Sequence, residues 1–198
     1  MRTHPHTRLS GKDLERLALN IDPGGWAIDL ERPISTLLGS CVAVCLYDPI
    51  LGLGGMNHFL LPTMGKGRES DDDVVLAGDF AMEVLVNAML DKGAIKTRLV
   101  AKAFGGGNVV GPLRVDIGDR NAQFAKEWLE REGIPLLTND FGGPWARKVL
   151  CVPGTGDAFC RRVRITMNNQ DAVRAVVEAE NTYQASLAMP KPGRVELF

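Results

Sequence analysis

Hydrophobic and polar residues along this chain follow two different periods. Short β-branched, aromatic and aliphatic runs bounded by Gly, Pro, Asn and Asp predict strands. Apolar residues three or four positions apart predict helices. The predicted strands lie at 26–30, 42–47, 56–61, 98–104, 134–138, 149–152 and 159–166, and the predicted helices at 11–20, 73–92, 118–132 and 169–187. Strands and helices alternate irregularly, so we expect an α/β fold with a mixed sheet rather than a doubly wound parallel one.

One predicted hairpin brings a thiol close to an imidazole. The strand that begins after Cys41 ends in an Asp-Pro turn followed by glycines, and the next strand contains His58. Antiparallel pairing about this turn would place Val44 roughly opposite His58. Cys41 would then lie within about one residue pair of the imidazole.

This pairing favours a nucleophilic cysteine. A free thiol is only slightly ionised at neutral pH and needs a neighbouring base, and His58 is the only histidine beyond the first six residues. Gly39 and Ser40 precede Cys41, and their backbone N–H groups could hold the oxyanion of a tetrahedral intermediate. The simpler alternative is that Cys41, like Cys45, is an inert small hydrophobe and His58 a hydrogen-bonded structural residue.

Composition excludes several classes of function. The chain has 198 residues, 45% of them hydrophobic and 24% charged, which predicts an ordinary globular domain. A net charge of −1 and the absence of a basic cluster argue against nucleic-acid binding. No apolar run is long enough for a membrane span and no signal peptide is apparent, so we expect a cytoplasmic protein without direct membrane insertion.

The cysteines also bear on metal binding. Cys41, Cys45, Cys151 and Cys160 include no Cys-x-x-Cys pair, so reduced thiols are expected. A metal held by Cys41, Cys45 and His58 is an alternative, but zinc sites normally bring four donors. We expect no metal and no cofactor.

A glycine-rich loop follows the strand at 98–104. Its sequence, Gly105-Gly106-Gly107-Asn108, invites comparison with phosphate-binding loops. Neither the Gly-x-Gly-x-x-Gly nor the Gly-Lys-Ser/Thr spacing is present. We therefore expect a close-packed loop beside the active site.

Several motifs together resemble one protein family. LGSCVAVCLYDP and GGMNHFLLP resemble the active-site signature of the CheD chemoreceptor glutamine deamidases. The resemblance continues in family order at 101–108, 117–121 and 141–149, and covers about residues 25–165. It implies a layered α/β sandwich, with helices packed on a mixed, largely antiparallel sheet.

The resemblance also implies site residues. The family's nucleophile falls on Cys41 and its catalytic histidine on His58. The family's third residue, a Thr six positions before the Cys, falls on Ser35, and the adjacent Thr36 is the alternative. The candidate residues of the loops that would meet the substrate are Gly106, Asn108, Asn121 and Arg147.

The implied function is deamidation of protein glutamine. Cys41 would attack a Gln carboxamide on the cytoplasmic helices of chemoreceptors, and water would cleave the resulting thioester to leave Glu. In the family this reaction tunes adaptation in chemotaxis. An alternative is that the chain is mainly a regulatory module that binds a CheC-like phosphatase, with catalysis secondary.

The C-terminal part of the chain differs from the rest. We divide the sequence into a CheD-like domain at 1–166 and a helical tail at 167–198. The simpler interpretation is that the tail helix packs its valines on the domain or is free in solution. The alternative is that residues 179–186, which resemble a receptor modification site, enter the active-site groove and present Gln184 to Cys41.

Overall fold

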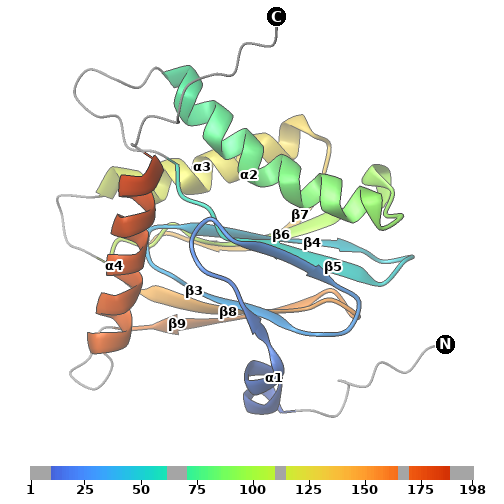
Figure 1. Cartoon of the computed structure of the whole chain (residues 1–198), viewed down its shortest axis with the longest axis horizontal. Coiled ribbons are helices and arrows are strands. Elements are labelled where there is room, and N and C mark those ends of the chain that lie inside the picture. The colour runs from blue at the N-terminus through green and yellow to red at the C-terminus, as the bar shows by residue number, and fades with distance from the viewer. Residues whose placement is uncertain (1–9, 62–70, 110–114, 165–169, 188–198) are drawn as a thin grey trace, which may run out of the picture.

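The computed structural model describes residues 10–61, 71–109, 115–164 and 170–187, and its elements form layers (Figure 1). Helices α2 (Asp71–Asp91) and α3 (Val115–Arg131) cover one face of a five-stranded sheet, and a four-stranded sheet lies against the other face. The short helix α1 (Gly11–Leu17) packs on the four-stranded sheet, and α4 (Gln170–Leu187) stands at one end of both sheets. The predicted layered α/β class is confirmed.

Most strand pairs in both sheets are antiparallel. The five-stranded sheet has the order β2 (Trp26–Asp29), β5 (Leu53–Asn57), β4 (Val42–Asp48), β6 (Val100–Gly105) and β7 (Leu136–Phe141). The four-stranded sheet has the order β1 (Leu19–Asn20), β3 (Ile34–Leu38), β8 (Ala146–Val152) and β9 (Asp157–Val163). Only the β6–β7 and β1–β3 pairs are parallel among these strands. The mixed, largely antiparallel pairing is as predicted, and the strands are divided between two sheets.

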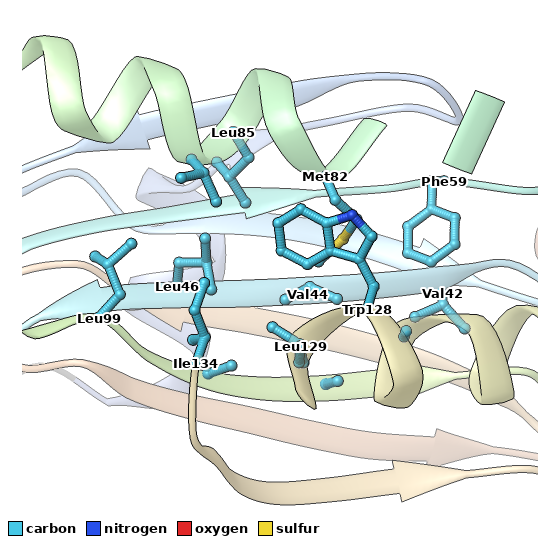
Figure 2. Packing of buried hydrophobic residues seen from close by; sticks show 14 of the residues in the cluster. Val42, Val44, Leu46, Phe59, Met82, Leu85, Leu99, Trp128, Leu129 and Ile134 are labelled. Carbon is cyan, nitrogen blue, oxygen red and sulfur yellow. The ribbon is translucent and has the colours of Figure 1, made fainter. Parts of the chain in front are cut away.

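Strand β4 shows why the layers form. Val42, Val44 and Leu46 point toward α2 and α3, where they pack in a cluster that contains Trp128 of α3 (Figure 2). Ala43 and Cys45 alternate with them and belong to a second cluster between the two sheets. The period of two side chains along a strand therefore fills both cores from one strand.

Several boundaries differ from the sequence prediction, and two of the differences change the assignment of residues near the predicted hairpin and the N-terminal helix. β5 begins at Leu53, so Gly54 and Gly55, which we predicted as turn residues, lie inside a buried strand. A Cβ at Gly55 would lie 2.8 Å from side-chain atoms of Ile28 and Leu85, which explains why glycine occupies this strand. The helix predicted at 11–20 ends at Leu17, and Leu19 begins β1 instead.

The β4–β5 register also differs by one residue from the prediction. Cys45 pairs with Met56, and an isolated bridge joins Val42 to Phe59, so Val44 is not opposite His58. The turn fixes this register, because the Asp48 carboxylate accepts hydrogen bonds from the Ile50 and Leu51 N–H groups. In the described part of the chain, no helix has the length and apolar character that a membrane span requires.

Candidate active site

Cys41 and His58 lie together, as predicted, and a third side chain joins them. Cys41 sits between β3 and β4, and His58 directly follows β5. Cys41 Sγ, a ring nitrogen of His58 and a carboxylate oxygen of Glu180 in α4 all lie within 4.8 Å of one another. All three residues are buried. The site therefore combines a thiol, an imidazole and a carboxylate that comes from the far end of the chain.

The turn before Cys41 binds the Glu180 carboxylate. The N–H groups of Gly39 and Cys41 donate to Oε1 at 2.8 and 3.2 Å, and the N–H of Ser40 donates to Oε2 at 3.1 Å. The Ser40 hydroxyl adds a fourth hydrogen bond to Oε2 at 2.8 Å. Convergent N–H groups of this kind form an anion-binding nest. We refer to the backbone of residues 39–41 as the anion nest.

Three groups behind the anion nest orient its peptides. The carbonyl oxygens of Gly39 and Cys41 accept hydrogen bonds from the Gly107 and Gly106 N–H groups, each at 2.8 Å. The Ser40 carbonyl accepts one from Asn121 Nδ2 at 2.9 Å. Because these carbonyls are held on the far side, the N–H groups remain directed at the site.

The glycine loop is close-packed, as the sequence indicates. Gly106 has a φ of +61°, and a Cβ there would lie 2.6 Å from the Gly118 carbonyl oxygen. A Cβ at Gly107 would lie 2.5 Å from the Trp145 carbonyl oxygen. Glycine at these two positions lets the loop approach the anion nest closely enough to hold it.

Thr36 contacts the imidazole. Its Oγ1 lies 2.8 Å from His58 Nδ1 and donates a hydrogen bond to the Ile21 carbonyl at 2.7 Å. The hydroxyl proton is therefore engaged, so Oγ1 accepts a hydrogen bond from Nδ1–H. This leaves the lone pair on Nε2, which is buried without a hydrogen-bond partner among the described residues.

Ser35, our first choice for the third residue, does not contact His58. Its hydroxyl donates to Asn20 Oδ1 and lies 3.2 Å from Lys148 Nζ. Successive residues of a strand point to opposite faces, so Ser35 and Thr36 of β3 cannot both reach the imidazole. The contact with the imidazole is thus made by the alternative residue, Thr36, and the catalytic role of either hydroxyl stays a prediction.

Burial keeps both reactive groups neutral in this conformation. It raises the pKa of the Cys41 thiol well above its usual range, and the charge of Glu180 and a hydrogen bond to Glu180 raise it further. Burial lowers the pKa of His58 to about 4, against the opposing effects of the Glu180 charge, a hydrogen bond to the Ile21 backbone and the Asp22 charge. The structure therefore holds a thiol and a neutral imidazole rather than an ion pair.

The other substrate-loop candidates lie around the site at different depths. Asn108 lines a small cavity with Ser40 and Glu180, and its Oδ1 is buried without a partner in the described structure. Arg147 is fully buried instead, where it bonds to Asp140 and to the Gly142 carbonyl. Gly106 and Asn121 support the anion nest from behind.

The three-residue cluster could in principle ligate a metal. Cys45 does not take part, since it lies against Cys151, so the metal set considered from the sequence is not brought together in the described residues. Glu180 replaces it in a Cys41, His58 and Glu180 group. Both carboxylate oxygens already accept hydrogen bonds, and the anion nest favours negative charge at this point rather than a cation.

Sequence reasoning missed Glu180. It lies 139 residues after Cys41, on a helix that we assigned to a tail. A detectable signal was present, because Glu180 occupies the apolar stripe of the helix, in step with Val173, Val176 and Val177. A carboxylate at such a position requires buried hydrogen-bond donors.

Together these features define a class: a layered α/β protein with a thiol and an imidazole beside an anion nest. Comparison with known proteins shows which family within this class the chain belongs to. The family described as "CheD chemotactic sensory transduction" matches residues 60–162. Proteins named "Probable chemoreceptor glutamine deamidase CheD 2" from Dechloromonas aromatica and Burkholderia thailandensis are 53% and 42% identical, over 98% and 94% of this chain and 99% and 96% of their own lengths. The chain belongs to the CheD family.

The relatives also span the C-terminal part of the chain. A "Probable chemoreceptor glutamine deamidase CheD 1" from Shewanella oneidensis is 41% identical over 96% of this chain and 92% of its own length. Our division at residue 166 stays a prediction. Among solved structures, the hypothetical protein YfiH of Bacillus licheniformis gives a TM-score of 0.37 at 15% identity, over 58% of this chain and 49% of that one, which is too low to carry an argument.

Proposed function

We propose that this protein is a chemoreceptor glutamine deamidase that uses Cys41 as its nucleophile. The observation that carries the proposal is the anion nest beside the Cys41 thiol, where a carboxylate already accepts hydrogen bonds from the backbone N–H groups of residues 39–41. A tetrahedral intermediate of amide hydrolysis carries its negative oxygen at such a position. The names of the relatives supply the substrate class.

The first half-reaction forms a thioester. Sγ of Cys41 attacks the carboxamide carbon of a substrate Gln while Nε2 of His58 takes the thiol proton. The carbonyl oxygen becomes an oxyanion in the anion nest. His58 then returns the proton to the departing nitrogen, the C–N bond breaks, and ammonia leaves.

The second half-reaction consumes one water. His58 removes a proton from water, the water oxygen attacks the thioester carbon, and the C–S bond breaks. Cys41 regains its proton and the substrate side chain is now Glu. Water thus supplies the new oxygen, and the side chain gains negative charge.

Thr36 is the positioning residue in this scheme. By accepting a hydrogen bond from Nδ1–H, it keeps the Nε2 lone pair available to Cys41. Ser35 lacks this contact. The partners that follow from the proposal are the cytoplasmic helices of chemoreceptors, which implies action in the cytoplasm; a CheC-like partner stays a prediction.

Mass spectrometry of receptors tests the proposal. Chemoreceptors co-expressed with this protein should contain Glu at specific positions encoded as Gln, each with a mass gain of about one dalton. The same receptors expressed alone should retain Gln. Receptors with unchanged Gln after co-expression with folded protein would contradict the function.

A further inference from the structure

Helix α4 stands at one end of the two sheets (Figure 1), and its residue Glu180 lies beside Cys41 and His58. One face of the helix turns inward: Val173 and Glu180 are buried, while Val176, Val177 and Tyr183 are half-buried. These residues recur every three or four positions, so they form one stripe. Glu180 lies in the middle of that stripe and enters the anion nest.

Residues of α4 on both sides of Glu180 line cavities together with residues of the domain. On one side, Val177 and Gln184 line a cavity with Ser40 and Asn108. On the other, Val176 and Ala179 line a cavity of about 320 Å³ with Thr36 and His58. Further along the helix, the Tyr183 ring packs so closely on Gly24 that a Cβ there would overlap it. The domain thus presents a groove that accommodates a helix.

The charge of Glu180 points to the same conclusion. Burying a carboxylate is costly unless hydrogen bonds replace its hydration. None of the ion pairs among the described residues includes Glu180, and its compensation comes from the anion nest and the Ser40 hydroxyl. A glutamate side chain, which is the product of glutamine deamidation, is therefore held where the reacting carbonyl oxygen would lie.

We propose that α4 occupies the substrate groove of its own chain and that Glu180 takes the place of the product side chain. This inference rests on the proposed function. It replaces Gln184 of our sequence hypothesis, since Gln184 lies one turn beyond the site. The residues around Glu180 in α4 also indicate what the substrate looks like. We expect a helix that presents Gln, with apolar or small residues three and four positions before the Gln and an aromatic or apolar residue three positions after it.

Docking in cis would make α4 a competitor of receptor helices. A tethered segment reaches an effective concentration in the millimolar range, so even weak binding keeps the groove largely occupied. The apparent affinity for substrate is the intrinsic affinity multiplied by the fraction of molecules whose groove is open, so it falls as that fraction becomes smaller. The docked carboxylate also raises the pKa of the Cys41 thiol, which holds the nucleophile in its unreactive form.

A peptide of α4 itself provides a defined probe. The peptide carries residues 170–187 with an acetylated N-terminus and Gln in place of Glu180, and is incubated at roughly millimolar concentration because an isolated helix of this length is marginal. The enzyme is the full chain with Glu180→Ala, which empties the anion nest. We expect conversion to Glu at position 180, while Gln170 and Gln184 of the same peptide stay unchanged. Equal conversion at all three positions, or none at 180 by an enzyme that deamidates receptors, would overturn the inference.

A receptor assay separates failure of this inference from failure of the proposed function. With a purified receptor cytoplasmic fragment, Glu180→Ala should lower the apparent KM at least about tenfold relative to wild type. Glu178→Ala, on the exposed face of α4, should behave like wild type. Equal rates for wild type and Glu180→Ala, or loss of activity in Glu180→Ala, would overturn the inference alone. Receptors left unchanged by all three proteins would overturn both.

A second variant reports on docking without any added substrate. In Glu180→Gln, the chain carries its own substrate, and the introduced glutamine should convert to Glu during storage, with a mass gain of about one dalton. The double variant Cys41→Ala, Glu180→Gln should keep the introduced glutamine. If the folded Glu180→Gln protein deamidates receptors but keeps its own introduced glutamine, α4 does not place this position in the anion nest, and the proposal is contradicted.

Discussion

Oγ1 of Thr36 lies 2.8 Å from Nδ1 of His58, and its own proton is committed to the Ile21 carbonyl. This arrangement selects the imidazole tautomer with a free Nε2, the nitrogen that must exchange protons with Cys41 in the proposed reaction. The contact makes the roles of two adjacent hydroxyl residues, Ser35 and Thr36, experimentally separable.

Thr36→Val should slow deamidation about 10- to 100-fold, which corresponds to roughly 1–3 kcal/mol for a lost buried hydrogen bond. Valine keeps the shape of the side chain but cannot hold the Nδ1–H tautomer. The pH dependence of kcat/KM should change as well, and Thr36→Ser should restore much of the rate. Ser35→Ala serves as the matched control and should stay close to wild type. A silent Thr36→Val together with an impaired Ser35→Ala would refute the tautomer argument.

His58→Ala should lose about 10²- to 10⁴-fold in kcat/KM, the range typical of a general acid–base group. The measurement is ammonia release from a receptor fragment. Melting temperatures of the variant and wild type should be compared, because the imidazole is buried. A folded His58→Ala protein with nearly full activity would exclude this histidine as the base.

Folding stability should decrease as the pH falls from about 6.5 to about 4, because of His58. Burial lowers its pKa to about 4 in the folded chain, whereas the unfolded chain takes up the proton near pH 6.5. The stabilisation is thus complete above pH 6.5 and is lost as the pH approaches 4, and it amounts to about 3 kcal/mol. Denaturant unfolding at several pH values should show a smaller loss over this window in His58→Gln. An identical pH dependence in both proteins would contradict the burial of a neutral imidazole.

The pairing of Cys41 with His58 was predictable because the two residues flank one tight hairpin, Cys41 just before β4 and His58 just after β5, even though the register differed by one residue. The third residue was harder to assign, because strand β3 was not recognised and the faces of Ser35 and Thr36 were therefore unknown. The presence of Glu180 at the site depends on the tertiary packing of α4, a helix that is distant from Cys41 in the sequence. Local periodicity gave the helix and its inward stripe, but it could not show which groove the stripe would fill.

Asn121→Asp tests whether the anion nest needs support from behind. The aspartate can still accept the Leu61 N–H bond, but it cannot donate to the Ser40 carbonyl. We expect kcat to fall about tenfold or more with little change in KM, since the Ser40 peptide would lose its orientation. Asn139→Asp, the same change at an exposed position of β7, should leave both constants unaltered. A shift in KM alone would mean that Asn121 acts on substrate binding instead.

The central claim is that Cys41, held beside the anion nest, is the nucleophile of a glutamine deamidase. The most direct test is the conversion of Gln to Glu in a purified receptor cytoplasmic fragment, followed by mass spectrometry for wild type, Cys41→Ala and Cys45→Ala. Cys45 is also a buried thiol, and it lies against Cys151 between the sheets. We expect conversion by wild type and Cys45→Ala and none by Cys41→Ala. Comparable conversion by the Cys41→Ala protein would contradict the claim.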